Sequence, residues 1–271
     1  MKKAKKLLAL TLCIIMVFGL TGCVSGEIGE IMEKNAAAEA KYSMVEYISH
    51  VNAYVYNETA DQIMTFEQDE LSAVRQLVRS GDRIAHTTYT TNAGTDIEET
   101  SKYSYYQRGR NAYFNLEEKG LRYRQRSRQS NVNDFLSDII DGLTESDFKS
   151  IRVTDMEDGG KRLRFRLDPK AIATETANDF LLAQGSFLPN GFGITGAELM
   201  GFEFTLTLDK EYLTRKQEHK ADILLHLENG STASWRHEES FVYKKYSYLE
   251  NDHLVFPEDL ADYPDYDTLD L

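Results

Sequence analysis

The feature that most constrains the fold is an alternation of apolar and polar side chains with a period of two residues. Residues 202–209 read Phe-Glu-Phe-Thr-Leu-Thr-Leu-Asp, and residues 162–167 read Arg-Leu-Arg-Phe-Arg-Leu. Because successive side chains of a strand point to opposite faces, this pattern is typical of antiparallel strands with one buried face and one polar face. We therefore expect a large antiparallel sheet.

Many other segments have the same character, since they are rich in Tyr, Thr and Val and are separated by turns that contain Gly or Asn. The remaining expected strands are 45–56, 71–79, 83–91, 96–107, 111–116, 121–124, 151–156, 213–227, 233–248 and a short one at 253–256. The implied topology is an up-and-down meander. No internal repeat is evident.

Two amphipathic helices are expected to interrupt the meander. Apolar residues recur at intervals of three and four in 132–143, and Asp168 and Pro169 are typical of the start of a second helix over 169–184. The segment 185–196 that follows is expected to be a loop. It contains Gly191-x-Gly193-x-x-Gly196, but neither a preceding strand nor a following helix supports a dinucleotide-binding turn.

The N-terminus has the layout of an export signal, with four lysines in residues 2–6, an apolar run over 7–18 and small residues near a cleavage point. The sequence Leu20-Thr21-Gly22-Cys23 resembles the lipobox of bacterial lipoproteins. That resemblance implies that Cys23 receives a diacylglyceryl group and becomes the first residue of the mature chain. An ordinary cleaved signal with an incidental cysteine is the alternative.

Composition narrows the function further. Cys13 lies inside the signal, so the mature chain has no thiol beyond Cys23. The net charge of −13 argues against nucleic acid as a partner. No spacing typical of a metal site is present among the six histidines, although His226 and His237 flank a turn and could meet across it. We expect no cofactor, no metal ion and a monomer.

The lipidated start, the long meander, two mid-chain helices and a closing Leu254-Val255-Phe256-Pro257 segment together resemble the LolA-like and LppX-like lipoprotein superfamily. The resemblance implies an α+β fold, in which a strongly curved antiparallel sheet forms an unclosed half-barrel and helices cover its concave face. It also implies an apolar cavity between sheet and helices, which in members of known function receives acyl chains.

Aromatic and apolar residues of the expected strands and helices are candidates to line such a cavity. They are Tyr103, Tyr105, Tyr113, Tyr123, Phe135, Ile139, Phe165, Phe180, Phe202, Phe204 and Trp235. The same residues are equally suited to a packed core without a cavity.

Two stripes of arginine form candidate contacts for an anionic surface. They consist of Arg122, Arg124, Arg126 and Arg128 in one strand region and Arg162, Arg164 and Arg166 in another. The alternative is a solvent-facing surface neutralised by acidic side chains such as Glu98 or Glu117, and we favour it.

The sequence thus predicts a signal peptide (1–22), a lipidated tether (23–40) that turns helical toward its end, a half-barrel domain (41–257) and an acidic tail (258–271). The predicted protein is a non-enzymatic lipoprotein on the extracytoplasmic face of the cell membrane. Its predicted ligand is hydrophobic or amphipathic, such as a lipid or lipopeptide. The alternative is an interaction or structural protein of the cell envelope with a packed core; an envelope hydrolase lacks a recognisable catalytic motif.

Overall fold

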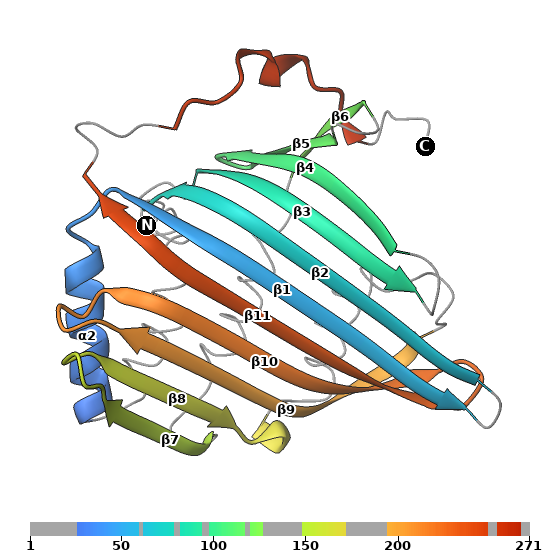
Figure 1. The fold of residues 1–271 in the computed structure, drawn as a ribbon, viewed down its shortest axis with the longest axis horizontal. Helices are drawn as coiled ribbons and strands as arrows, with labels where there is room; N and C mark the ends of the chain where they lie inside the picture. The colour runs from blue at the N-terminus through green and yellow to red at the C-terminus, as the bar shows by residue number, and fades with distance from the viewer. Residues whose placement is uncertain are drawn as a thin grey trace, which may run out of the picture.

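The computed structural model describes residues 26–59, 62–78, 82–93, 98–116, 120–126, 148–171, 194–248 and 254–266. Within them, eleven strands form a single antiparallel sheet (Figure 1). The strands are β1 (Met44–Thr59), β2 (Gln62–Leu77), β3 (Arg83–Ala93), β4 (Glu98–Arg108), β5 (Asn111–Leu116), β6 (Leu121–Arg126), β7 (Phe148–Asp155), β8 (Lys161–Leu167), β9 (Ile194–Leu208), β10 (Thr214–Leu227) and β11 (Thr232–Ser247). The expected antiparallel sheet of alternating strands is confirmed.

Two meanders meet in the middle of this sheet. The strand order is β6-β5-β4-β3-β2-β1-β11-β10-β9-β8-β7, so each half follows the chain and β1 pairs with β11 (Figure 1). Their antiparallel register runs from Met44 opposite Ser247 to Tyr56 opposite Ser234. Among the described strands, β6 and β7 each have one strand neighbour, so the sheet is open and not a closed barrel.

Two glycines show why the hairpins turn where they do. Gly230 has a φ of +79°, which L-residues with a side chain rarely adopt, and it follows Asn229, whose side-chain oxygen accepts a hydrogen bond from the Ser231 amide. A Cβ atom at Gly160 would lie 2.3 Å from the carbonyl oxygen of Leu208. The β7–β8 turn can therefore approach β9 closely only with glycine there.

Some bounds differ from those expected. Strand β2 begins at Gln62, well before the expected 71–79, and β9 begins at Ile194, inside the expected loop. No strand forms over 254–257, so the short strand expected at 253–256 is not seen in its described part. Pro169–Ala171 form a 3-10 turn, η4. The rest of that expected helix, and the whole helix expected at 132–143, lie outside the described residues, so helices covering a concave face are not confirmed.

The two faces of the sheet are defined by its register, because directly paired residues on adjacent strands share a face. One row crosses six adjacent strands and consists of Phe165, Phe204, His219, Glu239, Val51 and Glu70. We call the face that carries this row the inner face, and the opposite one the outer face. Most of the large side chains of β8–β11 that are fully buried belong to the inner face.

Helix α2 (Glu27–Glu39) packs against the inner face beside the ends of β8, β9 and β10 (Figure 1). Ile31 and Met32 are buried in a cluster with Leu163, Phe165, Leu167, Phe204, Leu206 and Leu208. The segment that we expected to be a tether is therefore a docked helix over residues 27–39, and it covers apolar surface that the sheet would otherwise expose.

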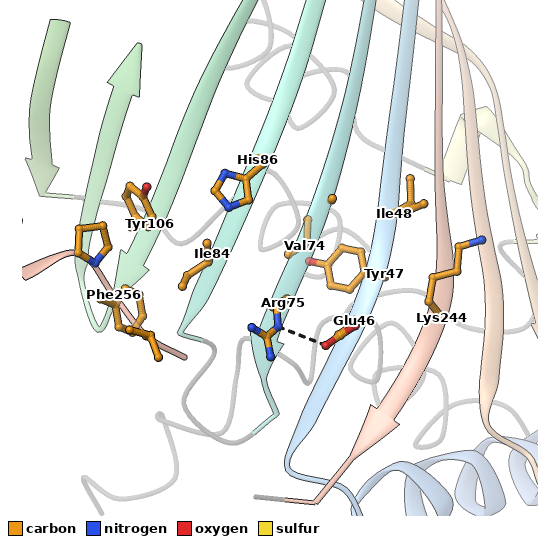
Figure 2. A pocket seen from close by; sticks show the side chains of 13 residues that line it. Glu46, Tyr47, Ile48, Val74, Arg75, Ile84, His86, Tyr106, Lys244 and Phe256 are labelled. Carbon is orange, nitrogen blue, oxygen red and sulfur yellow. Dashed lines mark hydrogen bonds and ion pairs between the residues drawn. The ribbon is translucent and has the colours of Figure 1, made fainter. Parts of the chain in front are cut away.

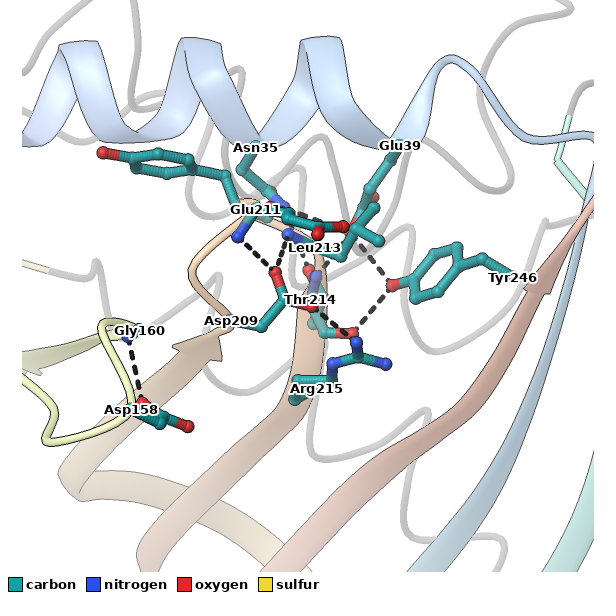
Figure 3. A network of polar contacts seen from close by, with 11 residues as sticks. Asn35, Glu39, Asp158, Gly160, Asp209, Glu211, Leu213, Thr214, Arg215 and Tyr246 are labelled. Atoms are coloured by element: carbon teal, nitrogen blue, oxygen red, sulfur yellow. Dashed lines mark hydrogen bonds and ion pairs between the residues drawn. The ribbon is translucent and has the colours of Figure 1, made fainter.

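A buried polar network holds the end of α2 in place (Figure 3). The Asn35 side chain donates a 2.7 Å hydrogen bond to the carbonyl oxygen of Tyr212, and the Glu39 carboxyl accepts hydrogen bonds from the Tyr246 hydroxyl and the Thr214 amide. Burial raises the pKa of Glu39, and the hydrogen bonds partly oppose that effect. The network fixes the helix because each buried polar group has its partner on the sheet.

The C-terminal segment 254–266 lies on the outer face over β3–β6 (Figure 1). Leu254, Leu260 of the short 3-10 helix η6 (Glu258–Asp262) and Tyr263 are buried against Ile84, Tyr106 and Tyr113. Its last described residues follow the free edge of β6, where the Arg124 amide donates to the carbonyl oxygen of Pro264. Residues 258–266 are thus docked on the sheet, whereas we expected an acidic tail there.

Candidate functional site

The inner face is largely apolar across β8–β11. Beyond the cluster under α2, a second cluster joins β1, β9, β10 and β11, and Val55, Ile223, Leu225 and Trp235 are its most deeply buried large members. Each of these side chains is at most 3% exposed. The row that contains His219 and Glu239 starts at Phe165 and Phe204 of the first cluster, and the second cluster begins one inner-face row further along the strands, at Ala221.

A polar band interrupts this apolar face. Glu239 and Glu70 both pair with Val51 of β1, from β11 on one side and β2 on the other, so the two carboxyl groups belong to one row. The Glu70 carboxyl accepts hydrogen bonds from the hydroxyls of Tyr103 (3.1 Å) and Ser72 (3.3 Å). Two acidic side chains therefore project to the inner face from β11 and β2, the two strands that flank β1.

His219 stands beside Glu239 in this band. Its imidazole is 6% exposed, and its Nδ1 atom lies 3.7 Å from Oε2 of Glu239, too far for a hydrogen bond. Neither ring nitrogen has a hydrogen-bond partner within the described structure, and neither does Nε1 of Trp235. Buried polar atoms are paired in the great majority of cases, so three unpaired nitrogens on one face are unusual.

Aromatic rings surround the imidazole of His219. The centroids of Phe204, Phe241 and Phe202 lie 5.2, 5.8 and 6.5 Å from its ring centroid. The first two contacts have edge-to-face geometry. These rings keep water away from the polar band and present their faces and edges to whatever occupies it.

Burial shifts the acid–base behaviour of the band toward neutral groups. It lowers the pKa of His219 to about 3 and that of His237 to about 4. Burial, assisted by the charge of Glu70, raises the pKa of Glu239 to about 7, and burial also raises the pKa of Glu70. The histidines are therefore uncharged at neutral pH, and the carboxyl groups carry whatever charge the band has.

Arg83 is the one described cation whose charge acts on both carboxyl groups of the band. Its guanidinium lies 5.0 Å from the centroid of the Tyr105 ring and donates to the Tyr105 hydroxyl at 3.4 Å. One guanidinium thus faces two carboxyl groups. When both carboxyls are ionised, the band carries one negative charge in excess.

The structure places most of the described candidate cavity residues on the inner face. Tyr103, Tyr105, Tyr123, Phe165, Phe202, Phe204 and Trp235 all belong to it by register. Tyr113 does not, because it faces outward and packs against Tyr263 with a centroid distance of 5.9 Å. Tyr113 therefore does not share a face with the other described candidates for a cavity lining. Phe135, Ile139 and Phe180 lie outside the described residues.

The described arginines of the two stripes lie on the outer face, and four of them are paired within the chain. Arg122 and Arg124 pair with Asp259 and Asp265 of the C-terminal segment, and Arg164 and Arg166 both pair with Glu203. Arg162 lines a polar groove of about 490 Å³ with Arg164, Glu203, Lys216 and Glu218. These pairs favour the interpretation of a neutralised surface, with partners other than Glu98 or Glu117. Nothing is described of the Arg126 side chain or of Arg128.

A second groove, of about 600 Å³, opens on the outer face beside the C-terminal segment (Figure 2). Ile48, Ile84, Tyr106, Val255 and Phe256 provide its apolar walls, and the ion pair of Arg75 with Glu46 (3.2 Å) lies at its side. Val255 is 70% exposed there.

The histidines do not form a metal site in the described residues, where no group of three or more His, Cys, Asp or Glu side chains converges. His226 faces outward and contacts Glu198 at 2.9 Å, whereas His237 is on the inner face in the row of Ala53 and Ala221. These two histidines therefore cannot share an ion across their turn. None of the helices among the described residues is long and apolar enough to span a membrane.

Comparisons with known proteins give only distant similarities. No family model matches the chain, and no curated protein matches it. Among solved structures, a β-barrel-like protein of the DUF1849 family from Brucella abortus has 8% identity and a TM-score of 0.28, over 75% of this chain and 100% of that one. A DUF1329 family protein from Desulfovibrio piger has 10% identity and a TM-score of 0.23, over 84% and 96%.

A LolA superfamily protein from Nitrosomonas europaea is also similar, with 9% identity and a TM-score of 0.21 over 85% of this chain and 97% of that one. Similarity at this level assigns neither a family nor a function.

Proposed function

We propose that this protein is a non-enzymatic, membrane-anchored binding protein outside the cytoplasm, and that it holds a hydrophobic or amphipathic ligand, such as a lipid or an acylated molecule, against the inner face of its sheet. The observation that carries the proposal is the set of unpaired nitrogens of His219 and Trp235 within an otherwise apolar face. A ligand with an apolar body and a polar group matches both properties, because it supplies hydrogen-bond partners and apolar contact together.

The position of α2 supports an arrangement close to the membrane. Only residues 24–26 separate Cys23, the proposed lipid attachment site, from the first residue of the docked helix. A chain of this length spans at most about 14 Å when fully extended. A lipid on Cys23 would therefore keep the inner face within a short distance of the bilayer surface, which suits local transfer of a ligand between membrane and protein.

The test is native mass spectrometry of the protein purified from cells that make it with Cys23→Ser, followed by organic extraction and lipid analysis. The expected result is a population with added mass that extraction removes, and uptake of a hydrophobic dye by the extracted protein. A homogeneous protein without added mass and without dye uptake would overturn the proposal.

The outer-face groove supports a second candidate function, the binding of an envelope partner. Its apolar walls and the exposed Val255 offer contact area, and the Glu46–Arg75 pair offers polar contacts at the side. This function predicts that Val255→Asp abolishes partner capture and leaves dye uptake unchanged. The opposite result, loss of dye uptake with Val255→Asp, would assign the groove to the ligand instead.

A further inference from the structure

We infer that the ligand of the inner face carries a protonated amine, and that this ammonium group binds between Glu239 and Glu70 beside His219, with the apolar part of the ligand on the flanking clusters. The inference rests on the proposed function and gives it a substrate class: amphipathic amines. It starts from the juxtaposition of two buried carboxyl groups and an unpaired buried imidazole in one row of the sheet.

Charge balance is the first argument. Among the described residues, two carboxyl groups of the polar band interact with one guanidinium, that of Arg83, and the histidines there are neutral because burial lowers the pKa of both. A buried carboxylate without a counter-ion is strongly disfavoured. One added positive charge would balance the band, whereas a phosphate, sulfate or carboxylate group would add to the excess of negative charge.

Hydrogen-bond geometry is the second argument. An ammonium group has three donors and no acceptor. The polar band offers acceptors: the carboxyl oxygens of Glu239 and Glu70, and one nitrogen of the neutral His219, whose Nδ1 lies 3.7 Å from Oε2 of Glu239. A donor placed between those two atoms could bond to both. Three donors that meet three acceptor groups favour an amine over an alcohol, which has a single donor.

The aromatic surroundings are the third argument. Phe204 and Phe241 lie 5.2 and 5.8 Å from the His219 ring, so a cation at the band would lie close to two aromatic rings, whose π-electrons attract positive charge. Leu206 lies on one side of this row, and Trp235 and Ile223 lie on the other, so apolar surface continues along the strands in both directions. An alkyl chain that leaves the polar band in either direction meets apolar side chains.

The chain contains its own reporter for the test. Trp235 is its only tryptophan, it lies on the inner face, and it is 3% exposed. Its fluorescence in the Cys23→Ser protein can be titrated with dodecylamine, dodecanol and dodecyl sulfate, each below its micelle concentration. We expect dodecylamine to bind at least tenfold more tightly than dodecanol at pH 7.5, and dodecyl sulfate to bind more weakly than either.

Variants test whether the preference for the amine depends on the two carboxyl groups. Glu239→Gln and Glu70→Gln should each reduce the preference for dodecylamine over dodecanol at least fivefold, while dodecanol affinity changes little. Glu238→Gln is the matched control, because Glu238 neighbours Glu239 in sequence but pairs with Lys220 on the outer face. That variant should keep the full preference.

Proton release gives a second readout. An ammonium group beside Glu239 favours its ionised form, so dodecylamine binding at pH 6.5 should expel a proton, measured by calorimetry in buffers of different ionisation enthalpy. Dodecanol should release none. If no probe binds, the proposed function fails. If the three probes bind equally, if the sulfate binds best, or if Glu239→Gln keeps the amine preference, the amine inference is overturned while the proposed function stands.

Discussion

The Nδ1 atom of His219 lies 3.7 Å from Oε2 of Glu239, but the two side chains are not an ion pair at neutral pH. An ion pair would need the imidazole to hold a proton, and burial lowers its pKa to about 3. The carboxyl group has its pKa raised to about 7, so between these two values both side chains are mainly uncharged. His219 and Glu239 therefore form a pair of mainly uncharged side chains, of which Glu239 ionises as the pH rises through about 7.

The first prediction concerns the pH dependence of folding stability in Glu239→Gln. The carboxyl group of Glu239 has a pKa of about 7 in the folded protein and about 4.5 in the unfolded chain. Its contribution to folding stability is therefore fully present below pH 4.5 and is lost as the pH rises through about 7. Compared with the natural protein, the variant should gain almost no stability at pH 4 and on the order of 3 kcal/mol above pH 7.

Urea unfolding at several pH values measures this difference. Glu238→Gln, on the outer face, is the control and should show no rise over the same range. A difference that stays flat between pH 4 and pH 8 for Glu239→Gln would contradict the burial of this carboxyl group.

The second prediction has the opposite sign and concerns His219. Its folded pKa of about 3 lies below the unfolded value of 6.5, so its contribution is present above pH 6.5 and is lost as the pH falls toward 3. His219→Leu removes two unpaired nitrogens from an apolar site, and we expect it to be as stable as the natural protein at pH 7 and more stable at pH 4. Thermal unfolding at both pH values measures the effect; the exposed His226→Leu serves as control. If the natural protein and His219→Leu lost equal stability between pH 7 and pH 4, the prediction would be wrong.

The third prediction tests whether α2 is part of the folded domain. Met32 is a fully buried residue of α2 that packs against the sheet, so Met32→Ala should lower the free energy of unfolding by about 2–5 kcal/mol. Glu33→Ala, at the exposed neighbouring position, should change it by less than about 0.5 kcal/mol. Chemical denaturation of both variants decides between a docked helix and a tether. Equal stability of the two variants would mean that the helix does not contribute to the core.

The sequence predicted the strands well because most of them have one face buried, which imposes the alternation directly. It did not predict that α2 docks on the sheet, because Asn35 and Glu39 interrupt the apolar stripe of that helix. Both polar groups are satisfied by Tyr212, Thr214 and Tyr246, whose positions are known only in the fold.

The polar band is visible in the sequence as polar residues at positions where the alternation calls for apolar ones. In β10, His219 falls on the apolar side of the alternation, between Gln217 and Ala221, and Glu239 does the same in β11. A polar residue in the apolar phase of a long strand marks a buried polar site. That Glu70 joins the same row follows only from the pairing of β1 with β2 and β11.

The C-terminal acids were expected to be solvated for a similar reason. Asp259 and Asp265 pair with Arg122 and Arg124, which lie more than a hundred residues earlier in the chain. No local pattern in the sequence indicates such long-range partners.

The last prediction concerns this docked C-terminal segment. Tyr263 is 4% exposed and packs against Tyr113, and the residues that follow it cover the edge of β6, which would otherwise offer unpaired backbone groups to other chains. We expect Tyr263→Ala to destabilise the protein by about 3 kcal/mol and to promote self-association at elevated protein concentration. Tyr266→Ala, at a position that is 44% exposed, should cause much smaller changes in stability and in self-association. Denaturation together with light scattering measures both effects. A Tyr263→Ala protein of natural stability would show that the segment is only loosely held, and the outer-face groove beside it would then lack a fixed wall.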